Sequence, residues 1–478
     1  DVRYSVTFGQ DRYSWDVETL LLNSIAEAEI PLLQYLPNLK TVAIVARDYP
    51  MTTVAMLQSA VHEMGLEFGI QMGGEILLDT QTALTVTGIT DEEVRLIPFF
   101  TQAQQVRLIN PQASVLKIQQ VCADYTEAAN VDFSWAVEFG GQTFEHTVTA
   151  VDLSMVEITD LAEVERKLSY LPDLETVTFG LCGVDDPNWG NSRSKLTASP
   201  IKNEDLAAYR DRVREHYKVV WSVKIGFLKV RTDETTFMPI KHNLAAQNDH
   251  LKDLVYCEDM ICVDLGHMGV RDLDWIYGMP KLQFLVLADT GVSDLTPIGT
   301  LKDLIYLELF NLKIDDYSPL LNCTKLQDLN IGTTYADPDP LSRMTWLHNL
   351  QWHRSDQNPE TKEAVLKLPE QLPDTNVVLF PKKKARNIGG PWRYIPNYYV
   401  FRDIIGATYF NQDQIADYWG KEDAARIMAC ESGKSFCADT LAQIIRERID
   451  NNEPIIGIKN TDSEKAEILY QSLLNAKP

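Results

Sequence analysis

Long apolar runs, cysteines and basic residues are all scarce in this 478-residue chain, and each scarcity excludes a class of protein. No uninterrupted apolar stretch approaches the roughly 20 residues of a membrane-spanning helix. The seven cysteines are too few and too scattered for a disulfide-rich framework. With 44 Lys and Arg against 68 Asp and Glu, the formal net charge is −24. Such a surface repels phosphates, so nucleic acids and anionic membranes are disfavoured partners.

Sequence motifs of known catalytic and cofactor-binding sites are missing as well. No nucleophile elbow, HExxH zinc motif, phosphate loop or dinucleotide fingerprint occurs in a convincing context, and we expect neither a cofactor nor a metal. Cys257 with Cys262, and Cys430 with Cys437, match no zinc spacing. Whether Cys430 and Cys437 are bonded stays open.

Two histidines stand at matching places in different repeats. His267 and His353 each follow a predicted strand, but several strand spacings of about 4.8 Å separate them. An acid–base or metal-binding pair at these positions is therefore disfavoured.

A segment built around a glycine recurs in the first half of the chain. The glycines are Gly9, Gly73, Gly140 and Gly226, with intervals of 64, 67 and 86 residues, and the longest interval contains a polar insertion at 185–203. Strand-like alternation flanks each glycine, so we expect a β-hairpin that ends one strand–helix module and begins the next. A phosphate-cradling loop is disfavoured because a strand, not a helix, follows the glycine.

A shorter and more regular period begins at residue 260. Successive units start at Met260, Leu282, Leu304 and Leu326, each 22 residues apart, and then at Leu347 after 21. Each unit has an apolar-x-x-apolar-x-apolar pattern, which predicts one short strand and a return segment that stack on their neighbours. The units resemble the 22-residue leucine-rich repeats of internalin-type bacterial surface proteins, whose D-L-x-P-L segment is matched by SDLTPI at 293–298.

The chain also departs from that family. The asparagine that such repeats place after the strand is replaced by Met268, Thr290, Leu312 and Thr334, so we expect no asparagine ladder. The wider layout is similar to uncharacterised leucine-rich-repeat proteins of Gram-positive anaerobes, which share a WR-x-x-P-N-Y-Y segment like the one that begins at Trp392. This resemblance implies a secreted or cell-surface protein and brings no known activity.

We therefore predict the α/β class: an elongated leucine-rich-repeat solenoid with irregular strand–helix modules and a C-terminal helical cap. The modules occupy residues 1–245. The short repeats and a closing strand occupy 246–381. A basic linker, which contains Lys382, Lys383, Lys384 and Arg386, and a helical subdomain occupy 382–478.

Aromatic residues are dense at the start of the predicted cap. They include Trp392, Tyr394, Tyr398 and Tyr399. Because a solenoid needs its last apolar face covered, packing explains them, and a sugar- or peptide-binding site is the alternative.

The candidate ligand-binding surface is the concave side of the short repeats, where the x residues of each strand are expected to face solvent. Aromatic rings beside carboxylates and amides are the composition of a protein-binding hot spot. The candidate residues are Phe284, Tyr306, Phe310, Asp264, Glu308, Asp328, Asn330, Gln351 and His353. Packing against a neighbouring module or the tail is the alternative for the same side chains.

The function predicted from the sequence is non-enzymatic recognition of a protein or glycan, outside a bacterial cell or anchored at its surface. We expect any secretion signal or anchor to lie outside this sequence. One rival is a polysaccharide-active enzyme with facing carboxylates where the repeats meet the tail. Another is a scaffold without its own ligand. The fold alone does not decide among them.

Overall fold

The computed structural model describes residues 3–45, 49–129, 131–183, 198–332, 336–353, 359–381, 390–431 and 435–476. Two compact units divide the chain. The first comprises residues 1–180, 193–201 and 210–219, and the second comprises 181–192, 202–209 and 220–478. Most of the polar insertion at 185–203 and the whole basic run at 382–386 lie outside the described residues. The three-part division of the sequence stays a prediction.

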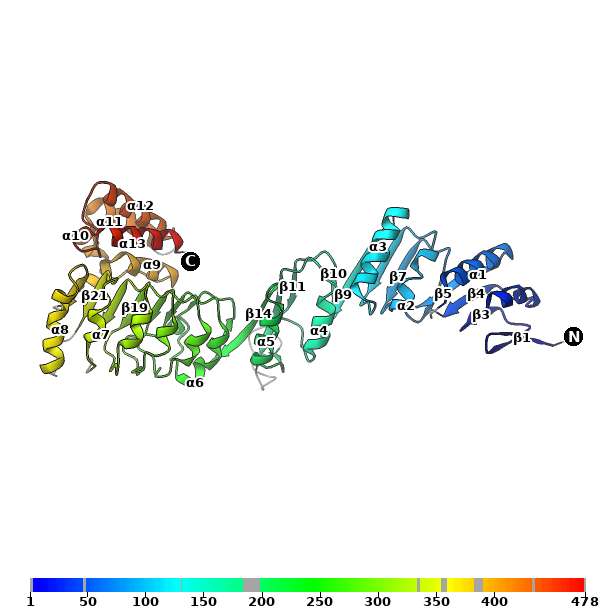
Figure 1. The fold of residues 1–478 in the computed structure, drawn as a ribbon, viewed down its shortest axis with the longest axis horizontal. Helices are drawn as coiled ribbons and strands as arrows, with labels where there is room; N and C mark the ends of the chain where they lie inside the picture. The colour runs from blue at the N-terminus through cyan, green and yellow to red at the C-terminus, as the bar shows by residue number, and fades with distance from the viewer. Residues whose placement is uncertain are drawn as a thin grey trace. The chain divides into compact units, whose positions relative to one another are not determined.

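Each module of the first unit combines parallel strands with a terminal hairpin (Figure 1). In one module β3 (Thr19–Leu22), β4 (Thr41–Val45) and β5 (Glu67–Met72) run parallel, and β6 (Glu75–Leu78) returns antiparallel to β5. The next repeats this order with β7 (Ala83–Thr87), β8 (Gln105–Ile109), β9 (Asp132–Phe139) and β10 (Gln142–Glu145). A free-standing hairpin, β1 (Ser5–Phe8) with β2 (Asp11–Ser14), precedes both.

Helices connect these strands. They are the 3-10 helix η1 (Glu27–Tyr35), α1 (Met51–Glu63), α2 (Asp91–Val94), η2 (Ile97–Phe99) and α3 (Val115–Ala129). The third module has β11 (Ala150–Leu153), α4 (Leu161–Leu168), β12 (Thr176–Cys182), β13 (Ala198–Ser199), α5 (Asn203–Val213), β14 (Lys218–Ile225) and β15 (Leu228–Arg231). The predicted hairpin at each glycine is confirmed.

A carboxylate twenty residues downstream secures the glycine turn. Gly9 and Gly73 have φ of 59° and 56°, in the left-handed region that glycine adopts without strain. The Gly9 amide donates to Glu29 at 3.1 Å, and the Gly73 amide donates to Glu93 at 3.0 Å. Glu29 and Glu93 lie in the first turns of η1 and α2. The hairpin of one module is thereby bonded to the first helical turn of the next.

Seven parallel strands in chain order form the sheet of the second unit. They are β16 (Thr236–Phe237), β17 (Cys262–Asp264), β18 (Phe284–Val286), β19 (Tyr306–Leu309), β20 (Asp328–Ile331), β21 (Asn349–Trp352) and β22 (Asn376–Leu379). Cys262 pairs with Phe284 and Phe284 with Tyr306, so the register follows the 22-residue period. The strand positions of the repeats and the closing strand are therefore confirmed, as are mixed α/β content and parallel sheets.

Short helices return the chain between these strands. They are η3 (Pro239–His242), α6 (Asn248–Leu251), η4 (Lys252–Tyr256), η5 (Asp274–Gly278), η6 (Ile298–Thr300), η7 (Ser318–Asn322), α7 (Asp339–Ser342) and α8 (Pro359–Gln371). Fully buried leucines at the repeat starts, such as Leu282, Leu304 and Leu326, lie between the two layers.

A polar ladder follows the strands, one residue earlier than the sequence placed it. His267, Asp289 and Asn311 all have positive φ, and the Asn311 amide donates to Asp289. The His267 ring lies 3.1 Å from the other oxygen of Asp289. Only one of these three residues is an asparagine, so the ladder is mixed and not an asparagine ladder. The turn position precedes Met268 and its equivalents by one residue and takes polar side chains that tolerate a left-handed backbone.

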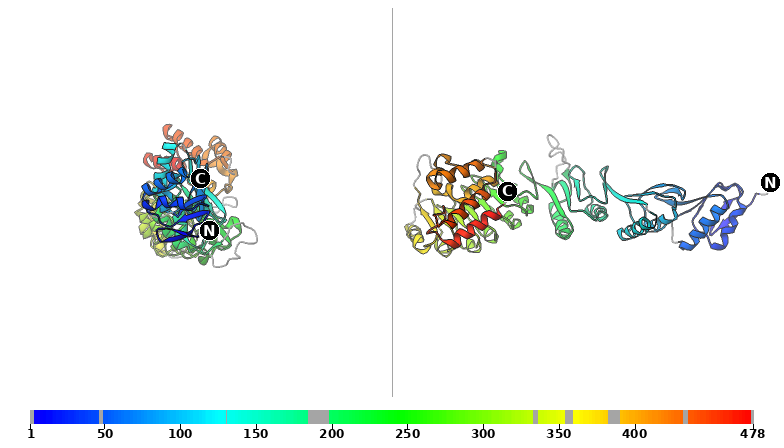
Figure 2. Two further views of the ribbon diagram at one scale, coloured as in Figure 1. Left: turned by 90° about the vertical axis from the view of Figure 1, so that its right-hand side faces the viewer. Right: turned by 90° about the horizontal axis from the view of Figure 1, so that it is seen from above.

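The C-terminal helices lie over one face of this sheet, and the two views of Figures 1 and 2 agree on this arrangement. These helices are η8 (Gly390–Tyr394), α9 (Pro396–Ile404), η9 (Gln412–Gln414), α10 (Ile415–Trp419), α11 (Lys421–Cys430), α12 (Cys437–Asp450) and α13 (Ser463–Asn475). Phe284 and Tyr306 belong to the same buried apolar cluster as Trp392 and Phe401. The sheet and the helices therefore share one core. Within the described residues, no helix combines the length and apolarity needed to cross a membrane.

Candidate functional site

The face of the sheet that carries most of the candidate residues is covered, not open to solvent. Of the nine candidate residues, Phe284, Tyr306, Glu308, Asp328, Asn330 and Gln351 are each 3% exposed or less. The Tyr306 ring stacks on Phe401 of α9 at 5.5 Å and lies 5.1 Å from the ring of Trp392. The expectation of solvent-facing x residues was wrong for these six, because the C-terminal helices pack on the strands. Their role in ligand binding stays a prediction.

Glu308 is the centre of a buried polar cluster between β19 and η8. Its Oε1 accepts from Tyr306 Oη, from Trp392 Nε1 at 2.9 Å and from Arg393 Nη1 at 3.0 Å. Burial acts to raise the pKa of Glu308, but the Arg393 charge and the donated hydrogen bonds outweigh it and lower the pKa below its usual value. The same pairing raises the pKa of Arg393. Glu308 is therefore a carboxylate whose charge is matched within the fold.

Asp328 behaves differently because, within the part of the chain that the structure describes, its carboxylate is bonded to amides and not to a cation. Its Oδ1 accepts from Asn349 Nδ2 at 2.6 Å, and its Oδ2 accepts from Asn397 Nδ2 of α9 at 2.8 Å. Burial raises its pKa to about 6 despite these hydrogen bonds. Asn397 also donates to Gln327, so one amide of α9 is bonded to two residues of the sheet.

Lys465 makes a further polar connection. From α13 its Nζ donates to the carbonyl oxygens of Leu347 at 2.6 Å and Asp374 at 2.7 Å, and the residue is only 6% exposed. Both carbonyls lie just before strands of the sheet. Burial lowers the pKa of Lys465.

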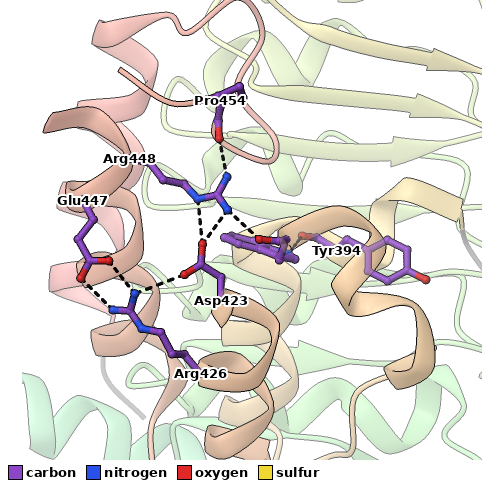
Figure 3. A network of polar contacts seen from close by, with 7 residues as sticks. Tyr394, Asp423, Arg426, Glu447, Arg448 and Pro454 are labelled. Atoms are coloured by element: carbon purple, nitrogen blue, oxygen red, sulfur yellow. Dashed lines mark hydrogen bonds and ion pairs between the residues drawn. The ribbon is translucent and has the colours of Figure 1, made fainter. Parts of the chain in front are cut away.

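An ion-pair network holds the C-terminal helices to one another (Figure 3). Arg448 of α12 donates to Asp423 of α11 at 2.7 Å and to the Pro454 carbonyl at 2.6 Å. Arg426 donates to Asp423 at 3.3 Å and to Glu447 at 2.7 Å. Figure 3 shows the two guanidinium groups on either side of Asp423, so this network joins α11 to α12.

Four side chains that are at least partly exposed, Asp264, Phe310, His353 and Phe410, are here called the rim. Asp264 and His353 interact electrostatically with Glu308, and Phe410 contacts Arg393. Phe310 and His353 meet edge to face with ring centroids 4.4 Å apart. Phe410 lies over the guanidinium groups of Arg393 at 5.3 Å and Arg402 at 4.6 Å, and remains 39% exposed.

Asp264 completes the rim on β17. It accepts from the Gly266 amide at 3.0 Å. Burial, with the charge of Glu308, raises its pKa to about 6, although Arg402 and Arg393 act in the opposite direction. Three of the nine candidate residues, Asp264, Phe310 and His353, thus remain partly exposed.

The four aromatic residues at the start of the tail are internal. Trp392, Tyr394, Tyr398 and Tyr399 are 2% exposed or less. Tyr398 is not available to stack on a sugar. Its hydroxyl accepts a hydrogen bond from the Phe410 amide at 2.9 Å, and its ring faces Arg393. The packing interpretation of these four rings fits the structure, and the binding interpretation does not.

The sequence-based search missed the residues that connect the tail to the sheet. They are Arg393, Asn397 and Lys465, and a charged or amide residue beside buried aromatics was a signal for the first two. His267 and His353 are not brought together, since His267 contacts Asp289 and His353 contacts Phe310. Among the described residues, which include all seven cysteines, no disulfide bond is formed. Among the residues that the structure describes, no group of three His, Cys, Asp or Glu is placed to hold a metal.

No family model and no curated protein matches the chain. It is similar to the solved structure of internalin C2 from Listeria monocytogenes, with 15% identity and a TM-score of 0.23 over 48% of this chain and 80% of that one. Internalin InlF from the same organism gives 14% identity and 0.25 over 65% and 84%. A leucine-rich-repeat protein of Leptospira interrogans gives 15% and 0.23 over 72% and 90%. At these identities and TM-scores the similar structures carry no argument about function, so the function has to be argued from the site.

Proposed function

We propose that the chain is a non-enzymatic recognition module that binds a protein through the rim, at the surface of a bacterial cell or outside it. We also propose that the second unit is a leucine-rich-repeat solenoid and that the C-terminal helices are its cap. The recognition surface then lies where sheet and cap meet, and not on an open concave face.

The observation that carries the proposal is the position of Phe410. Phe410 is 39% exposed, yet its ring is held in place by contact with the guanidinium groups of Arg393 and Arg402. A rigid aromatic ring beside arginine is the kind of anchor that dominates protein–protein binding energy, because little side-chain entropy is lost on association. Phe310 and His353 supply a second fixed aromatic pair on the same rim.

The polysaccharide-active rival finds no support in the carboxylates of the site. Glu308 is 3% exposed, and its Oε1 already accepts three hydrogen bonds. Both oxygens of Asp328 are bonded to amides and the residue is 1% exposed. A glycosidase needs two carboxylates that face one another across a cleft and reach the substrate. Of the three carboxylates Glu308, Asp328 and Asp264, only Asp264 is partly exposed.

The test is capture with the intact chain as bait, from bacterial and host surface extracts, followed by a glycan array. The variant is Phe310→Ala with Phe410→Ala, and the control is Tyr277→Ala, which removes a ring that is 54% exposed on η5, outside the rim. We expect a protein that the control retains and the rim variant binds at least tenfold more weakly. Undiminished binding by the rim variant, or capture of glycans alone, would contradict the proposal.

A further inference from the structure

Cys430 and Cys437 end one helix and begin the next, and their thiols meet. Cys430 is the last residue of α11 and Cys437 is the first residue of α12. The two thiols are hydrogen-bonded to each other. Cys430 Sγ also lies 3.3 Å from Thr440 Oγ1, one turn along α12 from Cys437. Both cysteines are buried, so the packing of the two helices holds the sulfur atoms together.

The two thiols differ in how readily they lose a proton. The hydrogen bond from Cys437 lowers the pKa of Cys430 to about 5, with burial acting in the opposite direction and Ser435 and Thr440 adding to the decrease. The same hydrogen bond, together with burial, raises the pKa of Cys437. Thiol–disulfide exchange starts from such a pair, because a thiolate attacks and a neighbouring thiol resolves the mixed disulfide.

Cys323, in the same unit, has a different environment. Its Sγ donates to the Ile298 carbonyl oxygen at 3.3 Å, and burial raises its pKa to about 12. It is therefore a protonated thiol of the repeat core, in contact with the backbone. Burial is common to Cys323, Cys430 and Cys437, so the contact between two thiols is what distinguishes the last two.

Both cysteines of this pair are connected to Tyr409. The Tyr409 amide donates to Glu431, the residue after Cys430, at 3.0 Å. The Cys437 amide donates to Asp403 at 2.7 Å, and Asp403 also accepts from the Tyr409 hydroxyl at 2.6 Å. A bond between the two sulfur atoms therefore restrains both groups that hold Tyr409.

We propose that Cys430 and Cys437 form an intramolecular disulfide in the presence of an oxidising low-molecular-weight disulfide, and that this bond restrains the segment of Tyr409 and Phe410. The Cys430 thiolate attacks one sulfur atom of the reagent, which breaks its S–S bond and releases one thiolate. The Cys437 sulfur then attacks Cys430, and its proton passes to the second thiolate that it displaces. Two thiols are oxidised to one disulfide, and the reagent is reduced to two thiols.

The disulfide itself does not depend on what the rim binds. Phe410 belongs to the rim, so an effect of the disulfide on binding rests on the proposed function. The experiment therefore reads out the bond and its local effect without a binding partner. Its failure and the failure of the capture test are then separate results.

The intact chain is incubated with oxidised glutathione, unfolded and labelled with iodoacetamide. We expect label on five of the seven cysteines, and a proteolytic fragment in which Cys430 and Cys437 are joined. Oxidation should raise the melting temperature by about 3–5 °C, because the bond closes a short loop in the unfolded chain. The matched control Cys323→Ala should form the same bond, whereas Cys430→Ser with Cys437→Ser should form none.

Hydrogen exchange measures the local effect of the bond. The amides of Tyr409 and Phe410 should exchange at least threefold more slowly in the oxidised parent than in the reduced one, and oxidation should not change them in the double serine variant. The labelling of the parent stands even where the serine variant does not fold. Label on all seven cysteines, a disulfide between other cysteines, or unchanged exchange at Tyr409 in the oxidised parent overturns the proposal.

Discussion

Arg393 donates from Nη1 to Glu308 across 3.0 Å, and this bond connects η8 of the C-terminal helices to β19 of the parallel sheet. The Glu308 side chain is 4% exposed and that of Arg393 16%. Two charges are thus buried at the contact and balance each other, and Glu308 also accepts hydrogen bonds from Tyr306 and Trp392. Such a pair adds little net stability, but the loss of one member leaves an unmatched charge.

Removing one member of this pair should be costly, and removing both should not. We expect Glu308→Ala to lower the free energy of unfolding by about 3–5 kcal/mol, because Arg393 then stays buried without its carboxylate. The double variant Glu308→Leu with Arg393→Met should come within about 1–2 kcal/mol of the parent. Denaturant unfolding followed by tryptophan fluorescence measures both. Equal losses in the two variants would show that the pair does not act as a unit.

The two aromatic candidates Tyr306 and Phe310 should respond differently to truncation. Tyr306 is 0% exposed and packs on Phe401, so Tyr306→Ala should cost about 3–5 kcal/mol. Phe310 lies on the rim, and Phe310→Ala should cost about 1 kcal/mol. Thermal unfolding of the two variants compares them directly. A large loss for Phe310→Ala would assign it to the core and weaken the proposed function.

A combined polar substitution of Phe284, Tyr306 and Phe310 should lower the melting temperature by several degrees, because the first two side chains are buried.

The short repeats could be predicted because their evidence is local. Leu282, Leu304 and Leu326 recur at one period, and each strand pairs with the next at that period. The covering of Phe284 and Tyr306 could not be predicted in this way, since the partners, such as Phe401, follow about a hundred residues later along the chain. The periodicity indicates which residues share a face, and only tertiary packing decides whether that face meets water. For the same reason the aromatic residues of the tail could be assigned to packing from the sequence, but the side chains that they pack against could not be named.

The stability of the second unit should change with pH through Asp328. Burial raises its pKa from the usual 3.8 to about 6, so between these values the folded state binds more protons than the unfolded chain. Asp328 therefore contributes stability near pH 4, and this contribution is lost as pH rises through 6. The unfolding free energy of the parent minus that of Asp328→Asn should fall by about 2 kcal/mol between pH 4 and pH 7.

A carboxylate with the opposite shift provides the control for this pH dependence. Hydrogen bonds from Thr296 lower the pKa of Asp294, so its contribution is lost as pH falls. The difference between the parent and Asp294→Asn should therefore have the opposite slope in urea unfolding at several pH values. A flat profile for Asp328→Asn would mean that folding does not raise the pKa of Asp328.

Neighbouring glycines of one turn should differ in their tolerance of a methyl group. Gly73 and Gly74 both have positive φ, 56° and 88°. A Cβ on Gly73 would lie 2.7 Å from the Thr87 carbonyl oxygen of β7, whereas a Cβ on Gly74 would meet nothing within 4 Å. Gly74→Ala should cost about 1–2 kcal/mol from backbone strain alone. Gly73→Ala adds the displacement of a strand in the next module, for about 3 kcal/mol in total. The melting temperatures of the two variants test this difference. An equal loss of stability in both would mean that the modules do not depend on the close approach of Gly73 to Thr87.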